Sequence, residues 1–383
     1  MFELCNIVHR VETDRFGPFQ FQIGLDAGQL ELAFIRVEDA HRRFVSSPLS
    51  AVANQLEREV LVQSVHGTNT IEGAELSESQ TEAVLDLPPE QIAKENEIRV
   101  RNIKSAYDLA IASATNPGWV LDVSFMQAVH AEISRDLEHA DNKPGLIRDN
   151  PRSRTTYVGN AEHGGRYKPP QYRGDIIKLL QGLVDWHTSL VRADVPALIR
   201  APLVHYYFEC IHPFWDGNGR TGRVIEATLL RQAGYRYAPF ALSRYYLEHI
   251  DLYFTLFNTG RKSAEKNRAN PNQEFVKFHL DGMLPVIEHL HGRVNDMVKA
   301  VLFQSDLADR MRSGEINKRQ WAIVHHVLDG RHPVKLSEMQ KQPWFLAMYG
   351  KKTLRTRDRD MQKLRTLNLL RTDDGGNLWP GFK

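Results

Sequence analysis

The chain has 383 residues, of which 42% are hydrophobic and 25% are charged, and its net charge is +2. This composition is typical of a globular protein with one large or two to three smaller domains. No run approaches the roughly 18 apolar residues that a membrane span needs, and the N-terminus lacks the apolar core of a signal peptide. Cys5 and Cys210 form no close-spaced metal or redox motif and no disulfide framework. We therefore expect a cytoplasmic protein without a membrane segment.

The first half of the chain is predicted to be mainly helical. Residues 1–25 alternate between apolar and polar side chains, which indicates short strands. From residue 25 to about residue 80 the spacing becomes helical, most clearly in NQLEREVLVQSVHGTNTIEG (54–73), where Gly73 is a stop signal. Further amphipathic helices are expected near residues 88–113, 122–136 and 172–192.

The segment PGLIRDNPRSRTTYVGNAEHGGRYKPP (144–170) interrupts this helical pattern with Pro, Gly, Asn and Arg. Its only strand-like run is 155–158. We interpret the segment as a functional flap, a hairpin with a following loop, that leaves the helical body. The alternative is a disordered loop.

Two helices are expected on either side of a glycine-containing turn. The first, ADVPALIRAPLVHYYFECI (193–211), is predicted to open at Asp194, with Pro196 in its first turn. The second, RTGRVIEATLLRQAG (220–234), is apolar on most sides, which is typical of a buried helix. Residues 212–219 therefore lie in a turn between two core helices.

The last 70 residues differ in charge and pattern. Residues 315–383 contain 14 Lys or Arg against 7 Asp or Glu, a net charge of +7. Helices are expected at 317–330, at 335–341 and after residue 351, followed by a hairpin turn at Asp374–Asn377. Three short helices and a hairpin are the layout of a winged helix. The third helix is predicted to bury one face, made of Leu354, Met361, Leu364 and Leu367.

This basic region supports two interpretations. Its charge suits nucleic acid, and the basic side chains near the third helix are Lys351, Lys352, Arg355, Arg357 and Arg359. Asp358 and Asp360 interrupt the positive face, so we favour contact with protein over contact with DNA.

The turn between the two core helices has the residues of a phosphate site. Gly217 and Gly219 flank Asn218 just before a helix, which lets consecutive backbone N–H groups turn toward one anion. Arg220 and Arg223 are three residues apart, so they share a helix face and can each bind phosphate oxygens.

Two more side chains extend this chemistry. Asp216 offers a hard oxygen ligand, which suits Mg²⁺. His212 follows a core helix and can act as a general base near neutral pH. Together these residues predict a phosphate-transfer site.

The stretch HPFWDGNGRTGR (212–223) resembles the Fic-domain signature, His-Pro-Phe-x-Asp/Glu-Gly-Asn-Gly-Arg-x-x-Arg, at all nine specified positions. The helical body, the flap and the buried helix after the motif are similar to the Fic core over roughly 120–260. The resemblance implies AMP transfer from ATP to a hydroxyl group of a protein. Phosphorylating members of the wider family carry Ala and Lys at the positions of Gly217 and Gly219, so the glycines favour nucleotidyl transfer.

By motif position, the resemblance implies that His212 deprotonates the Ser, Thr or Tyr hydroxyl of the target. Asp216 would hold Mg²⁺ on the α- and β-phosphates, and Asn218 would contact the α-phosphate. Gly217 and Gly219 would donate backbone N–H groups.

The two arginines have separate implied roles, Arg220 for the β-phosphate and Arg223 for the γ-phosphate. Upstream, TNTIEG (68–73) resembles the inhibitory motif of the family, Ser/Thr-x-x-x-Glu-Gly/Asn. Glu72 is then expected to pair with Arg223, because a carboxylate that neutralises a phosphate-binding arginine competes directly with phosphate. The alternative is a helix-terminal Glu-Gly without a partner.

Three further assignments have structural alternatives. The flap of the family aligns the target by strand addition, and the candidates here are Arg154, Thr155, Thr156 and Tyr157, whose alternative is simple loop chemistry. Tyr253, in a segment similar to the one beside the nucleotide base, is a candidate to face adenine, and its alternative is the core. Cys210, two residues before His212, has a thiol nucleophile as its alternative, but its apolar helix favours a packed thiol.

The expected fold is mainly α, with a β-hairpin flap. We divide the chain into an N-terminal region with the inhibitory helix (1–115), a Fic core (116–262), connecting helices (263–313) and a winged-helix-like domain (314–383). The expected function is an autoinhibited protein adenylyltransferase that uses ATP and Mg²⁺, and self-modification and a homodimer are compatible with it. The alternatives are a DNA-binding regulator with a nucleotide-sensing Fic core, and a Fic enzyme that uses another nucleotide donor or removes AMP.

Overall fold

The computed structural model describes residues 4–46, 56–138, 142–330 and 334–382. It is mostly helical, as predicted, and it divides into two compact units, Met1–His291 and Gly292–Lys383. The division of the chain into four regions stays a prediction. None of the helices in the described ranges is both long and apolar enough to cross a membrane.

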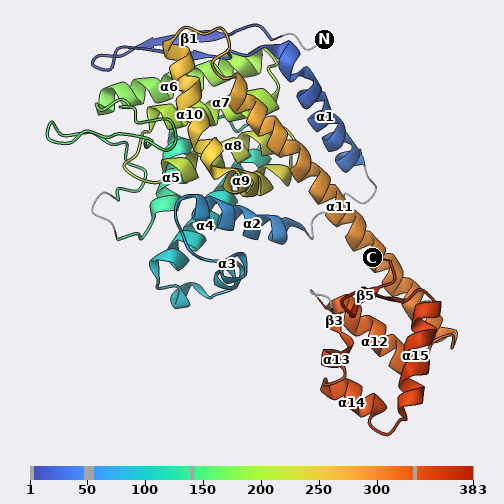
Figure 1. The fold of residues 1–383 in the computed structure, drawn as a ribbon. Helices are drawn as coiled ribbons and strands as arrows, with labels where there is room; N and C mark the ends of the chain where they lie inside the picture. Colours follow the sequence, from blue (N-terminus) through green and yellow to red (C-terminus); the bar gives the residue numbers. More distant parts are fainter. Residues whose placement is uncertain (1–3, 47–55, 139–141, 331–333, 383) are drawn as a thin grey trace. The chain divides into compact units, whose positions relative to one another are not determined.

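The helices of the first unit surround α7 and α8, which are buried on nearly every side. Helix α8 packs against α4, α5, α7 and α9 (Figure 1). Full burial of a Leu or Phe side chain contributes about 2 kcal/mol, so these two helices anchor the loop between them. The helices of this unit are α1 (Ala27–Ser46), α2 (Leu56–Ile71), α3 (Glu78–Leu85), η2 (Pro89–Gln91), α4 (Glu95–Thr115), α5 (Val123–Ser134), α6 (Arg173–Arg192), α7 (Ala197–Ile211), α8 (Asn218–Gln232), α9 (Ala238–Glu248) and α10 (Ile250–Glu265). Helix α11 (Gln273–Arg312) contains the boundary between the units.

The predicted N-terminal strands form an antiparallel hairpin, β1 (Val8–Glu12) and β2 (Pro18–Gln22). The hairpin packs on α6, where the ring of Phe21 stacks on Trp186 at 5.9 Å. The buried carboxylate of Asp175, in the first turn of α6, accepts hydrogen bonds from the backbone N–H groups of residues 14–16. One acidic side chain therefore holds the hairpin turn against the helical body.

Helix α7 begins later than the sequence predicts. Asp194 has a φ of 52° and does not cap the helix, which starts at Ala197 directly after Pro196. The predicted N-cap is wrong because residues 193–195 continue the turn that ends α6, with the N–H groups of Asp194 and Val195 bonded back to its last carbonyls.

The second unit contains a three-stranded antiparallel sheet in the order β3-β5-β4. The predicted hairpin is confirmed: Thr372 pairs with Leu378 across a turn in which Gly376 has a φ of 76°. Helix α14, which begins at a proline, was not predicted. The elements are α12 (Lys318–Asp329), β3 (Val334–Lys335), α13 (Leu336–Met339), α14 (Pro343–Tyr349), α15 (Leu354–Thr366), β4 (Leu370–Thr372) and β5 (Asn377–Pro380).

Two expectations for α15 are wrong. Leu354 is 67% exposed, because it lies in the first turn of the helix, whereas Met361 and Leu364 are buried as predicted. Asp360 does not interrupt a positive surface, since it is buried and bonded to Arg319, Gln320 and Tyr349. The winged-helix assignment is compatible with this element order and stays a prediction, as does contact with DNA or protein.

Candidate active site

The site is built on the loop that joins α7 to α8. Helix α7 ends at Ile211 and is followed by His212, which has a left-handed backbone with φ 50°, and α8 begins after Gly217, which has φ 77°. Glycine is favoured at such an angle because it has no Cβ to clash with the backbone. The loop therefore reverses the chain within a few residues and leaves the first N–H groups of α8 without helical partners.

Two buried side chains hold this loop in place. The amide of Asn218 accepts from the N–H of Phe214 and donates to its carbonyl, both at 2.9 Å. The fully buried ring of Phe214 stacks on His130 at 3.7 Å. The side chain of Asn218 thus stabilises the loop, and its predicted contact with the α-phosphate stays a prediction.

His130 has an assignable protonation state. Its Nδ1 accepts from the N–H of Gly145, so its Nε2 donates to the carbonyl of Asp216, both at 2.9 Å. Burial lowers the pKa of His130 to about 4, which keeps the ring neutral.

Arg148 and Tyr167 hold the C-terminal end of α7 from the flap segment, and sequence reasoning missed both. The buried guanidinium of Arg148 donates to the carbonyl of His212 at 2.7 Å. The hydroxyl of Tyr167 donates to the carbonyl of Glu209 at 2.6 Å. An arginine and a tyrosine in a Pro- and Gly-rich segment give no indication of their partners, which lie about 60 positions from Arg148 and about 40 positions from Tyr167.

A cavity of about 270 Å³ faces His212. It is lined by residues of the flap, α7, α8 and α10, together with Glu72. The Nδ1 of His212 is buried and lies 3.6 Å from a carboxylate oxygen of Glu209. Glu209, which sequence reasoning also missed, therefore places a negative charge beside the predicted base.

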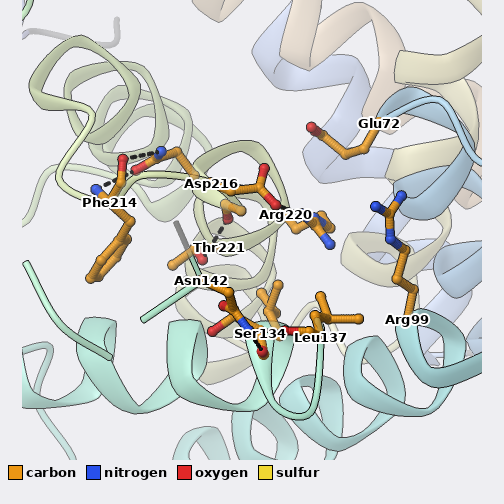
Figure 2. Close-up of polar contacts among 12 residues, drawn as sticks. Glu72, Arg99, Ser134, Leu137, Asn142, Phe214, Asp216, Arg220 and Thr221 are labelled. Atoms are coloured by element: carbon orange, nitrogen blue, oxygen red, sulfur yellow. Dashed lines mark hydrogen bonds and ion pairs between the residues drawn. The ribbon is translucent and has the colours of Figure 1, made fainter. Parts of the chain in front are cut away.

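Asp216 lies in the loop and Arg220 in the first turn of α8, with Arg99 of α4 nearby (Figure 2). A nitrogen of Arg220 donates to Asp216 at 2.8 Å. Burial alone would raise the pKa of Asp216, but Arg220, the backbone N–H of Gly217 and, last, Arg99 together outweigh it and lower this pKa. The carboxylate is thus ionised, and its side chain is 57% exposed.

Glu72 and Arg223 form the predicted ion pair. Glu72 directly follows α2, and its Oε1 lies 2.6 Å from a nitrogen of Arg223. The same nitrogen donates to the carbonyl of Thr68 at 3.2 Å. A Cβ added at Gly219 would lie 2.4 Å from Glu72 Oε1, so this carboxylate covers the first turn of α8 and would have to move for a ligand to bind there.

The comparisons with known proteins agree with this geometry. A model of the Fic/DOC family matches residues 120–230. These residues form a Fic domain.

Proteins similar to this chain are named adenylyltransferases. Protein adenylyltransferase fic-1 of Caenorhabditis elegans is 29% identical over 209 residues, which are 52% of this chain and 37% of the relative. Protein adenylyltransferase Fic of Drosophila willistoni is 28% identical over 203 residues, 51% of this chain and 38% of the relative. The chain thus spans less than two fifths of the length of these relatives.

Two solved structures share the fold. A Fic family protein from Desulfovibrio desulfuricans has a TM-score of 0.55 and 18% identity and matches 92% of this chain and 95% of its own. Fic-1 from C. elegans has a TM-score of 0.54 and 21% identity and matches 71% of this chain and 74% of its own.

The flap of the Fic domain has little regular structure. The run predicted as a strand, 155–158, forms a single antiparallel bridge, Val158 with Tyr167. The backbone of Thr156 is bonded at both its N–H and its carbonyl to the side chain of Gln171, which limits pairing with a neighbouring strand. Arg154 lies over the ring of Trp215 at 4.2 Å, and Thr155 and Tyr157 are exposed.

Two predicted side chains are buried beside the site. Tyr253 is 1% exposed, and its hydroxyl contacts Arg223 at 3.3 Å, while its contact with adenine stays a prediction. Cys210 is packed in the core, as favoured from the sequence, and burial raises its pKa to about 12, which disfavours a thiolate nucleophile.

Proposed function

We propose that the protein is an adenylyltransferase that moves AMP from ATP to a Ser, Thr or Tyr hydroxyl of a protein, itself included. The observation that supports this most strongly is the convergence of His212, the first turn of α8 and Arg223 on one cavity. A helix N-terminus and a buried arginine suit the phosphates of a nucleotide.

The reaction needs a base and a stabilised leaving group. The hydroxyl oxygen of the target attacks the α-phosphorus, the bond between this phosphorus and the α,β-bridging oxygen breaks, and pyrophosphate leaves. His212 takes the hydroxyl proton, and its Nδ1 is buried beside Glu209, so we expect Nε2 to act. Arg220, Arg223 and the N–H groups at Gly217–Gly219 bind the phosphates and stabilise the developing negative charge.

The residues present fit a magnesium ion that is held mainly by phosphate. In the described part of the chain, no three His, Cys, Asp or Glu side chains gather into a metal site, but Asp216, in the loop, is ionised and partly exposed. Mg²⁺ commonly binds through one or two carboxylates together with substrate phosphates. Asp216 would hold the ion, which supplies positive charge to the phosphate oxygens when bound.

Glu72 restrains this activity in our proposal. It uses the guanidinium that we assign to the γ-phosphate and covers the first turn of α8. Because both groups are anionic, ATP and Glu72 compete for Arg223. A second copy of the chain, contact with DNA and removal of AMP have no comparable support.

ATP labelled in two positions tests the proposal. The Glu72→Gly variant should incorporate label from the α-phosphate of ATP into protein and none from the γ-phosphate. Label from the γ-phosphate would indicate kinase chemistry instead. Competition by unlabelled UTP or CTP tests the donor: strong competition would contradict ATP as the preferred donor.

A further inference from the structure

A series of buried hydrogen bonds leads away from Arg223, starting at the terminal guanidinium nitrogen that does not pair with Glu72. The hydroxyl of Tyr253 lies 3.3 Å from a nitrogen of Arg223 and 3.0 Å from Nε2 of His205. Nδ1 of His205 lies 2.9 Å from the carboxylate of Glu226. All four residues are at most 3% exposed.

Glu226 is an anion in the core. Its second oxygen lies 2.9 Å from Nδ1 of His279, and the hydroxyl of Tyr246 donates to both oxygens. Burial alone would raise the pKa of Glu226, but His205 and His279 outweigh it and lower this pKa to about 2. Burying a charge with this many partners costs less free energy than burying an unpaired one. Hydrophobic packing alone would not require a charged residue at this position.

The charge on Glu226 decides which groups donate and which accept along these hydrogen bonds. Nδ1 of His205 faces the Glu226 anion and donates to it, so Nε2 is an acceptor whenever the ring carries that one proton. Burial raises the pKa of Tyr253 despite Arg223, so its hydroxyl keeps the proton and donates to Nε2. The lone pair of the hydroxyl then accepts from Arg223, a donor only.

A glycine of α8 leaves the space that His205 occupies in this series of hydrogen bonds. A Cβ added at Gly222 would lie 2.7 Å from Cδ2 of His205 and 2.9 Å from a carboxylate oxygen of Glu209. Gly222 is one of the two positions that the Fic signature leaves open, between Arg220 and Arg223. A side chain there would push His205 away from Glu226.

We propose that Tyr253, His205 and Glu226 are positioning residues that hold the Arg223 guanidinium in the orientation that binds the terminal phosphate of a nucleoside triphosphate. This inference rests on the proposed function, in which Arg223 contacts the γ-phosphate. When Glu72 gives way, the remaining contacts of Arg223 among the described residues are the carbonyl of Thr68 and the hydroxyl of Tyr253. These hydrogen bonds keep the side chain of Arg223 in place without neutralising its charge, because the group that contacts it is the uncharged hydroxyl of Tyr253.

The test compares the affinities of α,β-methylene-ATP and α,β-methylene-ADP, measured by calorimetry with magnesium. In both analogues the bond that AMP transfer breaks is blocked, and only the first carries a γ-phosphate. The 383-residue Glu72→Gly chain should bind the ATP analogue more tightly than the ADP analogue. Adding Tyr253→Phe should reduce this preference about tenfold, by loss of one hydrogen bond to a charged group.

Tyr207→Phe is the matched control. Its buried hydroxyl bonds to Gln22 and Asn272, so its loss should leave the ratio of the two affinities unchanged. Glu226→Gln, which removes the anion but keeps the size, decides the test if Tyr253→Phe fails to fold, and it should also reduce the ratio. An unchanged ratio in folded Tyr253→Phe, or in folded Glu226→Gln where that variant decides, overturns the inference. Equal affinities for both analogues in Glu72→Gly itself would instead overturn the γ-phosphate role of Arg223, and the inference with it.

Discussion

Replacing Glu72 by glycine should release the activity that this residue restrains. Its carboxylate lies 2.6 Å from Arg223, whose side chain is 2% exposed, while Glu72 is 26% exposed. A hydrogen bond to a charged group contributes about 1.5–3 kcal/mol, and the partial exposure of Glu72 favours the lower half of that range. About 2 kcal/mol corresponds to a roughly 30-fold change in an equilibrium constant.

The assay is incorporation of α-labelled AMP at an ATP concentration well below saturation. Glu72→Gly should raise the rate roughly 30-fold, because ATP no longer displaces a bound carboxylate. Glu72→Gln retains most of the bulk over Gly219 without the charge, so its gain should be smaller and separates charge from steric occupancy. Glu75→Gly, at an exposed residue three positions on, is the control and should leave the rate unchanged. If Glu72→Gly incorporates no more AMP than the wild type, the inhibitory role of Glu72 is wrong.

Three other predictions concern residues of the first unit, including His187 of α6. Burial lowers the pKa of His130 and of His187 to about 4. As the pH falls below 6.5, these histidines therefore take up protons in the unfolded chain before they do so in the folded one. Each histidine should lower the free energy of unfolding by about 2 kcal/mol at pH 5 relative to pH 7.5. Thermal unfolding at pH 7.5 and 5.0 measures this loss, which should be smaller in His187→Gln; an equal loss would contradict the assignment. Arg148→Lys should lower AMP transfer about tenfold or more and change ATP affinity less than twofold, because Arg148 holds the backbone of the base and contacts no phosphate; a parallel loss of affinity would argue against a positioning role. Gly219→Ala should destabilise the wild type by about 1–3 kcal/mol through its clash with Glu72 and cost less in Glu72→Gly, so additive effects on unfolding would contradict the contact.

The local part of the site could be predicted from the sequence. The loop between α7 and α8 depends on neighbours in the chain: a glycine at positive φ, an asparagine that bonds four residues back, and arginines on one helix face. The pair of Glu72 with Arg223 spans 151 positions, and it was predicted because the motif around Glu72 resembles the inhibitory motif of the family.

The supporting part of the site could not be predicted in this way. Arg148 and His130 bind carbonyls of the loop, and Tyr167 binds carbonyls at the C-terminal end of α7, from 42 to 86 positions away in the sequence. Their local sequence gives no indication of which carbonyl each one binds. The prediction that Asp194 caps α7 was wrong for the opposite reason. The local capping signal was present, but Asp194 belongs to the turn that ends α6. The burial of Glu226 has the same cause, because a glutamate in a helix is ordinarily exposed and its two histidine partners come from other helices.

The most direct test of the account is mass spectrometry of lysate proteins after incubation with ATP, Mg²⁺ and the Glu72→Gly protein. An adenylyltransferase with His212 as its base should yield peptides that carry one added AMP on a Ser, Thr or Tyr hydroxyl, and none when His212→Ala is added to the same protein. AMP-modified peptides that persist at the same level in the double variant, or their absence from the Glu72→Gly reaction, would contradict His212-dependent AMP transfer.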